Sequence, residues 1–340
     1  MSHALRIHEA GPAVTLQDLG RSGTIAQGLT RGGAMDRLAL FEGAALLDQP
    51  VTAAVEMVGY GGTFEATQDI RIALTGAKMQ ASLDGNPLTW NASHLLPAGA
   101  KLRLGGVTSG AVGYLHVGGG FDAPMVMGAM SAHLSAGLGT ILQAGQTLAL
   151  HSDTKTRTGW HLPPSDRLTG GTLHIVRSVQ TDVFGADILA RFLASAFTRD
   201  ARANRQGIRL NPDRGGFAAA GGLSVVSEII APGDIQITGD GAPYVLMCES
   251  QTTGGYPRLG TVIPSDLPRI AQAPLGAAIQ IKLVSYEDAI TIEQRARAHI
   301  KTLPGLCRPL IRDPADMSDL LSYSLISGTI NANADPFEGS

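Results

Sequence analysis

The sequence has few of the features that would point directly to a class of protein. Only two cysteines, Cys248 and Cys307, occur in 340 residues. Two distant cysteines exclude a disulfide framework and a C-x-x-C redox or zinc motif. Charged residues make up 16% of the chain, and the net charge of −3 includes no block of like charges. Because nucleic-acid binding needs clustered lysine and arginine, we expect no nucleic-acid partner.

Long apolar runs and targeting signals are also missing. No run approaches the ~18 apolar residues that span a membrane. The first residues, MSHALRIHEAGP, show no apolar signal core behind a basic segment. We therefore expect no membrane contact and a location in the reducing cytoplasm.

The common catalytic motifs are absent as well. The chain has no G-x-S-x-G elbow, no G-x-x-x-x-G-K-[ST] phosphate loop and no H-E-x-x-H pair. We therefore expect no metal site and no ATP bound through a P-loop. The segment GGGFDAP at 118–124 can be aligned with a dinucleotide-binding loop. Pro124 and the lack of acidic residues between Asp122 and Asp153 instead favour a tight turn.

A second partial motif surrounds Lys78. The segment GAKMQ resembles the Ala-Met-Lys-Met hairpin that carries covalent biotin, but the methionine before the lysine is missing. Its position in the chain does not suit a carrier domain either. We expect Lys78 to be an ordinary strand residue, and we expect no covalent cofactor on this chain.

Strand patterns dominate what is present. The 43 glycines and the low aromatic content of 5% indicate many tight turns and closely packed backbone. Alternating segments such as TFEATQDIRIALTG, separated by turn signals, predict a mainly β chain with a few helices. Helices are predicted at 35–48, at 182–197, and after Ser285, where Ser285 and Asp288 fit a capping box.

The chain is long enough for two domains, since domains typically contain ~100–200 residues. The polar segment 151–171, with proline and glycine, is typical of a linker. We therefore predict an N-terminal β-rich domain at 1–160, a C-terminal domain at 170–292, and a helix plus extended tail at 293–340. The extended part of the tail is expected at 303–340.

Polar side chains repeatedly stand beside glycines. A bare glycine backbone lets a ligand approach N–H groups, which can stabilise an oxyanion. Five segments share this pattern: LQDLGRSG with Arg21, RGGAMD with Asp36, ANRQGIRL with Arg205, ITGDGAP with Asp240, and SQTTGGYP with Gln251, Thr253 and Tyr256. A turn capped by its own side chain explains any one segment, but explains the whole set less well.

Together with GGGFDAP, these segments resemble the allophanate hydrolase subunit 2 family. It is also called the biotin-dependent carboxyltransferase family and includes the C component of 5-oxoprolinase. The resemblance extends in order from about residue 5 to about residue 290, and Thr-Gly-Gly-Tyr-Pro with the downstream Asp266 and Gln272 is its most specific part. Met130 stands where the family often has arginine, and Glu249 stands where it has aspartate.

The resemblance implies two β-barrel-like domains, the second similar to cyclophilin. It also implies a homologous subunit 1 as partner, in a heterodimer or hetero-oligomer, joined in the 5-oxoprolinase case by a third 5-oxoprolinase subunit. We favour ATP-dependent hydrolysis of 5-oxoproline, with ATP acting through the assembled complex. Two alternatives stay open: a carboxyltransferase component of a urea carboxylase-like system, with biotin supplied by a partner, and a non-catalytic regulator that binds the subunit 1 homologue.

Either reaction develops charge on the carbonyl oxygen of a small amide- or urea-like substrate. Backbone N–H groups of Gly254 and Gly255, with Thr253 and Arg205, are candidates to hold that oxygen. Tyr256 could stack on a small ring, and Gln251 belongs to the same rim loop. Asp36, as a catalytic candidate, or Glu228 or Asp240 could orient the N–H side of the substrate. The remaining candidates for substrate binding are Arg21, Asp266 and Gln272.

Overall fold

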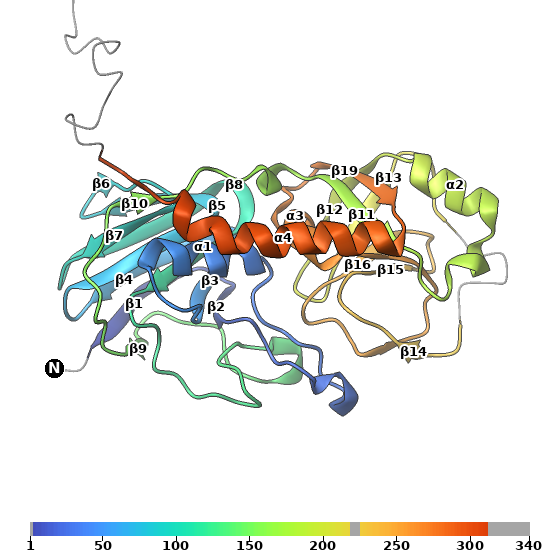
Figure 1. Ribbon diagram of the computed structural model, residues 1–340. Helices are drawn as coiled ribbons and strands as arrows, with labels where there is room; N and C mark the ends of the chain where they lie inside the picture. The colour runs from blue at the N-terminus through green and yellow to red at the C-terminus, as the bar shows by residue number, and fades with distance from the viewer. Residues whose placement is uncertain (1–2, 218–224, 312–340) are drawn as a thin grey trace, which may run out of the picture.

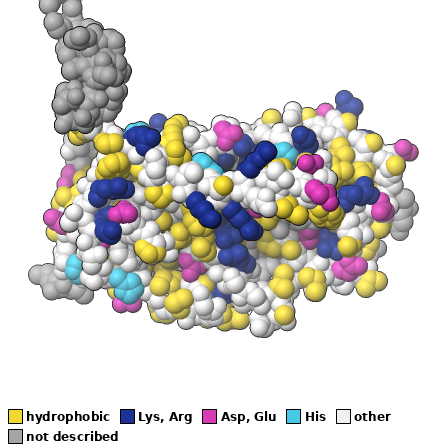
Figure 2. Space-filling model, in the orientation of Figure 1, with side chains coloured by type: hydrophobic (Ala, Val, Ile, Leu, Met, Phe, Trp, Pro, Cys, Tyr) yellow, Lys and Arg dark blue, Asp and Glu magenta, His cyan; other side chains and the backbone are white. Residues whose placement is uncertain are grey.

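The computed structural model describes residues 3–217 and 225–311, and it is mainly β, as predicted. Two groups of strands lie side by side, and one long helix, α4 (Tyr286–Leu306), extends along both (Figure 1). Figure 2 shows that basic and acidic side chains both occur on this face, so neither sign of charge covers it alone. No helix within the described ranges is long and apolar enough to cross a membrane.

The N-terminal strands form one eleven-stranded sheet. Its main path is β20-β10-β7-β5-β8-β4-β1-β9, with β2 paired to β3, β3 to β8, and β6 to β5. The two longest strands, β5 and β8, lie at its centre and pair antiparallel. Apolar side chains such as Leu5, Leu74 and Leu115 form its buried core. The strands are β1 (Ala4–Ala10), β2 (Val14–Gln17), β3 (Ala54–Val58), β4 (Tyr60–Ala66), β5 (Ile70–Leu83), β6 (Asn86–Pro87), β7 (Ala92–Leu96), β8 (Lys101–Val117), β9 (Thr147–Ala149), β10 (Trp160–His161) and β20 (Arg308–Pro309).

The C-terminal strands close into a seven-stranded barrel, in the order β11-β18-β15-β16-β13-β12-β19. Phe192, Phe197 and Phe217 pack together in its core, and the ring centroid of Phe192 lies 5.1 Å from each of the other two. A separate ribbon pairs β14 (Glu228–Ile229) with β17 (Thr253–Gly254). The barrel strands are β11 (Gly171–Val176), β12 (Phe197–Ala203), β13 (Gly207–Pro212), β15 (Asp234–Ile237), β16 (Pro243–Leu246), β18 (Arg258–Val262) and β19 (Ala278–Leu283).

The first predicted helix is confirmed and the second is shorter than predicted. Helix α1 (Arg37–Leu47) begins behind Asp36, whose Oδ1 accepts from the backbone N–H of Ala39. The prediction of a helix at 182–197 is wrong at both ends. A 3-10 turn at Thr181–Phe184 ends at Gly185, which has a φ of 75°, and α2 (Ala186–Ala194) follows. The aromatic residue that follows, Phe197, begins β12.

Helix α4 begins at the predicted cap. The N–H of Asp288 donates to Ser285 Oγ over 3.0 Å, and that hydroxyl donates to Asp288 Oδ2 over 2.9 Å. The helix continues through Pro304 to Leu306, so residues 303–306 are not extended as we predicted. Strand β20 then pairs with β10 of the N-terminal sheet. The rest of the predicted tail, 312–340, lies outside the described residues.

The segment 151–171 is more ordered than the predicted linker. Strand β10 pairs with β7, and a 3-10 helix, η3 (Asp166–Thr169), buries Arg167 against α1. The guanidinium of Arg167 forms a bidentate ion pair with Glu42 and a third hydrogen bond with Asp36. The segment is polar, as expected for a linker. However, polar side chains such as Arg167 form tertiary contacts in the folded chain. Another short helix, α3 (Leu267–Gln272), packs next to η3.

Candidate functional site

A cavity of about 610 Å³ lies against β12, β13, β15 and β16 of the barrel. Four residues of the predicted rim loop line it: Gln251, Gly254, Gly255 and Tyr256. Asn204 reaches it from the turn between β12 and β13, and Gln236, Tyr244 and Ser250 complete its polar side. The structure thus brings most of the SQTTGGYP segment together at one cavity. Thr253 is exposed and does not line this cavity.

At Gly254 the space for a side chain is limited by packing, while the backbone conformation itself does not call for glycine. A Cβ atom at this position would lie 2.7 Å from Gln236 Nε2 and 3.0 Å from Ile230 Cδ1. Its φ is not in the left-handed region, in contrast to the conformation that glycine-rich loops often need. A side chain here would push the Gln236 amide out of its place in the cavity wall.

A buried hydroxyl group of a residue in the cavity wall has no partner in the part of the protein that the structure describes. Ser250 is 4% exposed, and its Oγ has no hydrogen-bond partner among the described residues. Such a group costs about 1–3 kcal/mol, which a hydrogen bond from a ligand would recover. Gln236 is 7% exposed, and within the described ranges its side-chain amide makes one hydrogen bond, a 3.5 Å contact from Nε2 to the Tyr256 carbonyl oxygen. Among the described residues, these two side chains therefore keep hydrogen-bonding capacity that protein partners do not use.

The charge of the cavity is low. Arg202 is the only charged side chain among the described residues that line it, and Asp200 pairs with Arg202. The described lining contains no carboxylate, histidine or lysine that could transfer a proton. The polar lining can hydrogen-bond an amide-like group, and the phenol groups of Tyr244 and Tyr256 are the described side chains in it that could transfer a proton.

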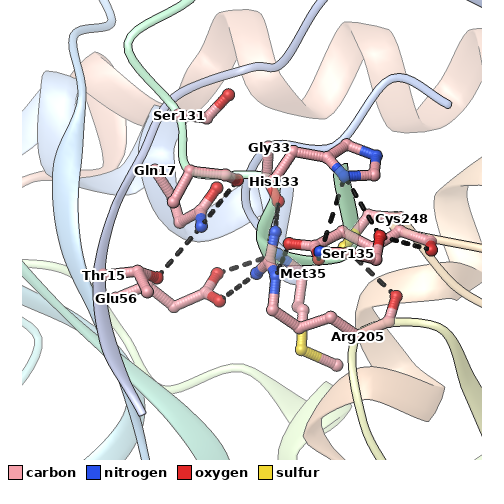
Figure 3. A network of polar contacts seen from close by, with 12 residues as sticks. Thr15, Gln17, Gly33, Met35, Glu56, Ser131, His133, Ser135, Arg205 and Cys248 are labelled. Carbon is pink, nitrogen blue, oxygen red and sulfur yellow. Dashed lines mark hydrogen bonds and ion pairs between the residues drawn. The ribbon is translucent and has the colours of Figure 1, made fainter. Parts of the chain in front are cut away.

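Arg205 does not face this cavity and instead joins the two halves of the chain (Figure 3). Its guanidinium donates to the Gly33 carbonyl oxygen over 2.6 Å and forms ion pairs with Glu56 and Glu249. Burial lowers the pKa of this group, but the Cys248 thiol and the two carboxylates raise it more, so Arg205 remains charged. Each guanidinium nitrogen of Arg205 already donates to one of these partners, and Arg205 does not line the barrel cavity, so the structure lends no support to the expected contact with a substrate oxygen.

The same network positions the start of the rim loop. Glu249 Oε2 accepts from the backbone N–H of Ser135, and Thr30 Oγ1 donates to the Ser250 carbonyl oxygen over 2.9 Å. His133 Nε2 lies 3.0 Å from Thr30 Oγ1, and burial lowers the pKa of His133. Residues from the N-terminal half therefore hold the chain directly before the cavity. Glu56 and His133 were missed by sequence reasoning, since neither stands beside glycines.

Asp36 and Gln272 form a second junction between the halves. Both are fully buried. Asp36 Oδ2 accepts from Gln272 Nε2 over 2.7 Å and from Arg167 Nε over 2.8 Å. Gln272 Oε1 accepts from the backbone N–H groups of Ala111 and Val112. Neither residue can touch a ligand in the cavity, which corrects the substrate contacts expected for Asp36 and Gln272.

The other predicted contact residues form hydrogen bonds or ion pairs with other protein groups and do not line the cavity. Arg21 is 2% exposed and donates to the carbonyl oxygens of Val126 and Ser131. Asp266 accepts from the backbone N–H of His174 and contacts its ring. Two further carboxylates form ion pairs at the barrel surface: Glu228 with Arg258, and Asp240 with Arg209. Within residues 3–217 and 225–311, no group of three or more His, Cys, Asp or Glu side chains could hold a metal ion.

Residues 27–283 match the family described as carboxyltransferase domain, subdomain A and B. The chain belongs to this carboxyltransferase family. It is 31% identical to the C component of 5-oxoprolinase from Haemophilus influenzae over 302 residues, which cover 84% of this chain and 93% of that protein. The Escherichia coli protein of the same name is 32% identical over 305 residues, covering 88% of this chain and 97% of the relative. These matches confirm the family resemblance inferred from the sequence.

The fold is also shared with a much longer protein. The crystal structure of the K. lactis urea amidolyase superposes with a TM-score of 0.78 at 20% identity. The match covers 92% of this chain and 21% of that chain. The sheet and barrel therefore form a unit that also occurs within a multidomain chain.

Proposed function

We propose that this chain is a subunit of a 5-oxoprolinase-type enzyme and acts together with a homologous subunit 1. The substrate is a small amide-like molecule, with ATP-dependent hydrolysis of 5-oxoproline as the favoured reaction. The observation that carries the proposal is the barrel cavity, whose lining includes the rim residues Gly254 and Tyr256 and also Ser250, a residue whose hydroxyl has no hydrogen-bond partner among the described residues. The names of the two relatives of similar length support the choice of reaction.

In this proposal the chain binds and orients the substrate. The Ser250 hydroxyl and the Gln236 amide hydrogen-bond the polar edge of the substrate, and the exposed ring of Tyr256 covers its face. Because the described cavity lining contains no carboxylate, histidine or lysine, subunit 1 or a third subunit supplies such a group in this proposal, and ATP acts through that assembly. The chain alone should therefore be inactive.

Ser250 offers a direct test, since its hydroxyl has no described hydrogen bond to lose. In the complex co-expressed with subunit 1 and the third subunit, Ser250→Ala should leave thermal melting unchanged and raise the KM for 5-oxoproline about tenfold, as expected for one lost ligand hydrogen bond. Ser265→Ala is the matched control, because Ser265 Oγ is also buried without a partner among the described residues but lies outside the cavity. Equal kinetics for the two variants would contradict the proposal.

A second variant tests the rim itself. Gly254→Val should lower turnover by ~10²-fold or more, comparable to the loss of one oxyanion-hole donor, because the side chain displaces the Gln236 amide. Gly106→Val is its control, since a Cβ atom there has nothing within 4 Å. Near-normal turnover of a folded Gly254→Val complex would mean that the loop is only a turn.

The alternative activity is transfer of a carboxyl group from a biotin carrier supplied by a partner. The description of the matched family as a carboxyltransferase domain favours it. The same complex should be assayed with urea and a carboxybiotin carrier. Urea-dependent consumption of carboxybiotin, with no 5-oxoproline turnover, would replace the favoured reaction by this one.

A further inference from the structure

Tyr244 lines the barrel cavity but takes no part in the substrate contacts proposed above. It lies in β16, between β13 and β15, and pairs directly with Arg209 on one side and with Gln236 on the other. Residues directly opposite each other on neighbouring antiparallel strands have their side chains on the same face of the sheet. Tyr244 is therefore the middle member of a row of three polar side chains that crosses three strands of the barrel.

The phenol group of Tyr244 has a hydrogen-bond donor to spare. Arg209 Cζ lies 5.8 Å from the centre of the Tyr244 ring. Burial lowers the pKa of Arg209, but hydrogen bonding to Tyr244 and to Asp240 raises it more. Because arginine has no acceptor atom, the phenol oxygen accepts in this contact and its own hydrogen remains to be donated. Among the described residues, no protein group accepts a hydrogen bond from this phenol.

The arginines near the phenol are paired with carboxylates. Arg209 pairs with Asp240 over 2.6 Å, and Arg202, the charged residue of the described cavity lining, pairs with Asp200 over 2.9 Å. These pairs leave little net charge around the phenol, which suits a ligand group that is neutral until it reacts. The carbonyl group of an amide- or urea-like molecule is such a group, since its oxygen becomes negatively charged only during the reaction.

The cavity has room for a ligand beside the Tyr244 ring. Gly207 also lines the cavity, and a Cβ atom there would lie 3.7 Å from Tyr244 Cδ1. Because residue 207 is a glycine, no side chain fills that space. Gln236, which is proposed to bind the polar edge of the substrate, pairs directly with Tyr244, and such pairs have Cβ atoms about 4.5–5.5 Å apart. A substrate held by Gln236 is therefore next to the phenol.

We propose that Tyr244 is a catalytic residue, whose phenol donates a hydrogen bond to the carbonyl oxygen of the substrate as negative charge develops there. The phenol keeps its proton throughout. The inference rests on the proposed function of the barrel cavity, but it applies to both reactions considered above, because each develops charge on a carbonyl oxygen. A donor that meets this charge stabilises the transition state more than the bound substrate, so it raises kcat and has little effect on KM.

Tyr244→Phe tests the inference, because it removes the donor and keeps the ring. In the complex co-expressed with subunit 1 and the third subunit, it should lower kcat for 5-oxoproline about 10²-fold and change KM less than about threefold. This pattern is the reverse of the raised KM expected for Ser250→Ala. Tyr60→Phe is the matched control, because the Tyr60 hydroxyl donates to Glu9 and Tyr60 lies outside this cavity. The melting temperatures and the control's kinetics should match the parent complex.

The inference is overturned if kcat of the Tyr244→Phe complex stays within about threefold of the parent value, or if only KM rises. A lowered melting temperature of this variant would also overturn it, since the hydroxyl would then serve the fold. If the parent complex carboxylates urea and does not hydrolyse 5-oxoproline, the favoured reaction fails, and the same comparison of kcat with urea decides about Tyr244. A parent complex that converts neither substrate would contradict the proposed function and this inference together.

Discussion

The side-chain amide of Gln272 donates a hydrogen bond of 2.7 Å to Asp36, a residue 236 positions earlier in the chain. The oxygen of the same amide accepts from two backbone N–H groups of β8, those of Ala111 and Val112. Its nitrogen also donates to the Val112 carbonyl oxygen over 2.8 Å, so one side chain of the barrel half satisfies four polar groups of the sheet half. The contact helps fix how the two halves pack, because a buried polar group left unpaired is costly.

Replacing Gln272 by leucine should therefore lower the free energy of unfolding by at least about 2 kcal/mol, since each unpaired buried group costs about 1–3 kcal/mol. Urea unfolding of the purified chain measures the effect. Gln143→Leu is the matched control, because Gln143 is exposed. A Gln272→Leu protein as stable as this control would show that the junction contributes little.

Removing the Arg205 guanidinium should destabilise the chain more strongly. The variant Arg205→Met leaves Glu56 and Glu249, whose side chains are 1% and 3% exposed, without their cation. Breaking such a buried pair by removing one partner typically costs about 3–5 kcal/mol. Arg177→Met removes an exposed ion pair with Asp182 and should cost less than about 1 kcal/mol. Similar unfolding midpoints for the two variants would refute this account of the network.

Acid stability should depend on His116. Burial lowers the pKa of His116 to about 3, and its Nε2 lies 2.7 Å from Thr75 Oγ1. Below about pH 6.5 the unfolded chain binds a proton at this residue that the folded chain does not bind until about pH 3. Its contribution to stability is therefore complete above pH 6.5 and is lost as the pH falls from 6.5 towards 3. His116→Gln should show a shallower decline of melting temperature over this range, and an identical decline would count against the prediction.

The contribution of the N-cap residue of α4, Ser285, to the free energy of unfolding should be measurable by itself. Ser285→Ala removes the acceptor for the Asp288 N–H and should lower the free energy of unfolding by about 1 kcal/mol. Thr291→Ala serves as the control, because it exchanges an exposed mid-helix residue for a better helix former. The prediction fails if the two alanine variants unfold at the same urea concentration.

Local patterns were sufficient for much of this fold. Alternating apolar residues and turn signals identified a mainly β chain, and the Ser285–Asp288 pair marked the start of α4. These features depend on residues that are close together in the sequence, so sequence patterns alone can predict them. The helix predicted to end at 197 failed for the opposite reason, since the apolar side chain of Phe197 is used by the barrel core and not by a helix.

Sequence patterns identified only part of the candidate site. The segment SQTTGGYP was recognised by its own residues, and Gln251, Gly254, Gly255 and Tyr256 do meet at one cavity. Asp36, Arg205 and Gln272 showed the same signal, polar groups near glycines or within a family motif, yet the structure buries them between the two halves. A polar side chain next to a glycine can hydrogen-bond either a ligand or a buried group of the protein itself. Which of the two it meets depends on residues more than a hundred positions away, and only tertiary packing brings those residues into contact.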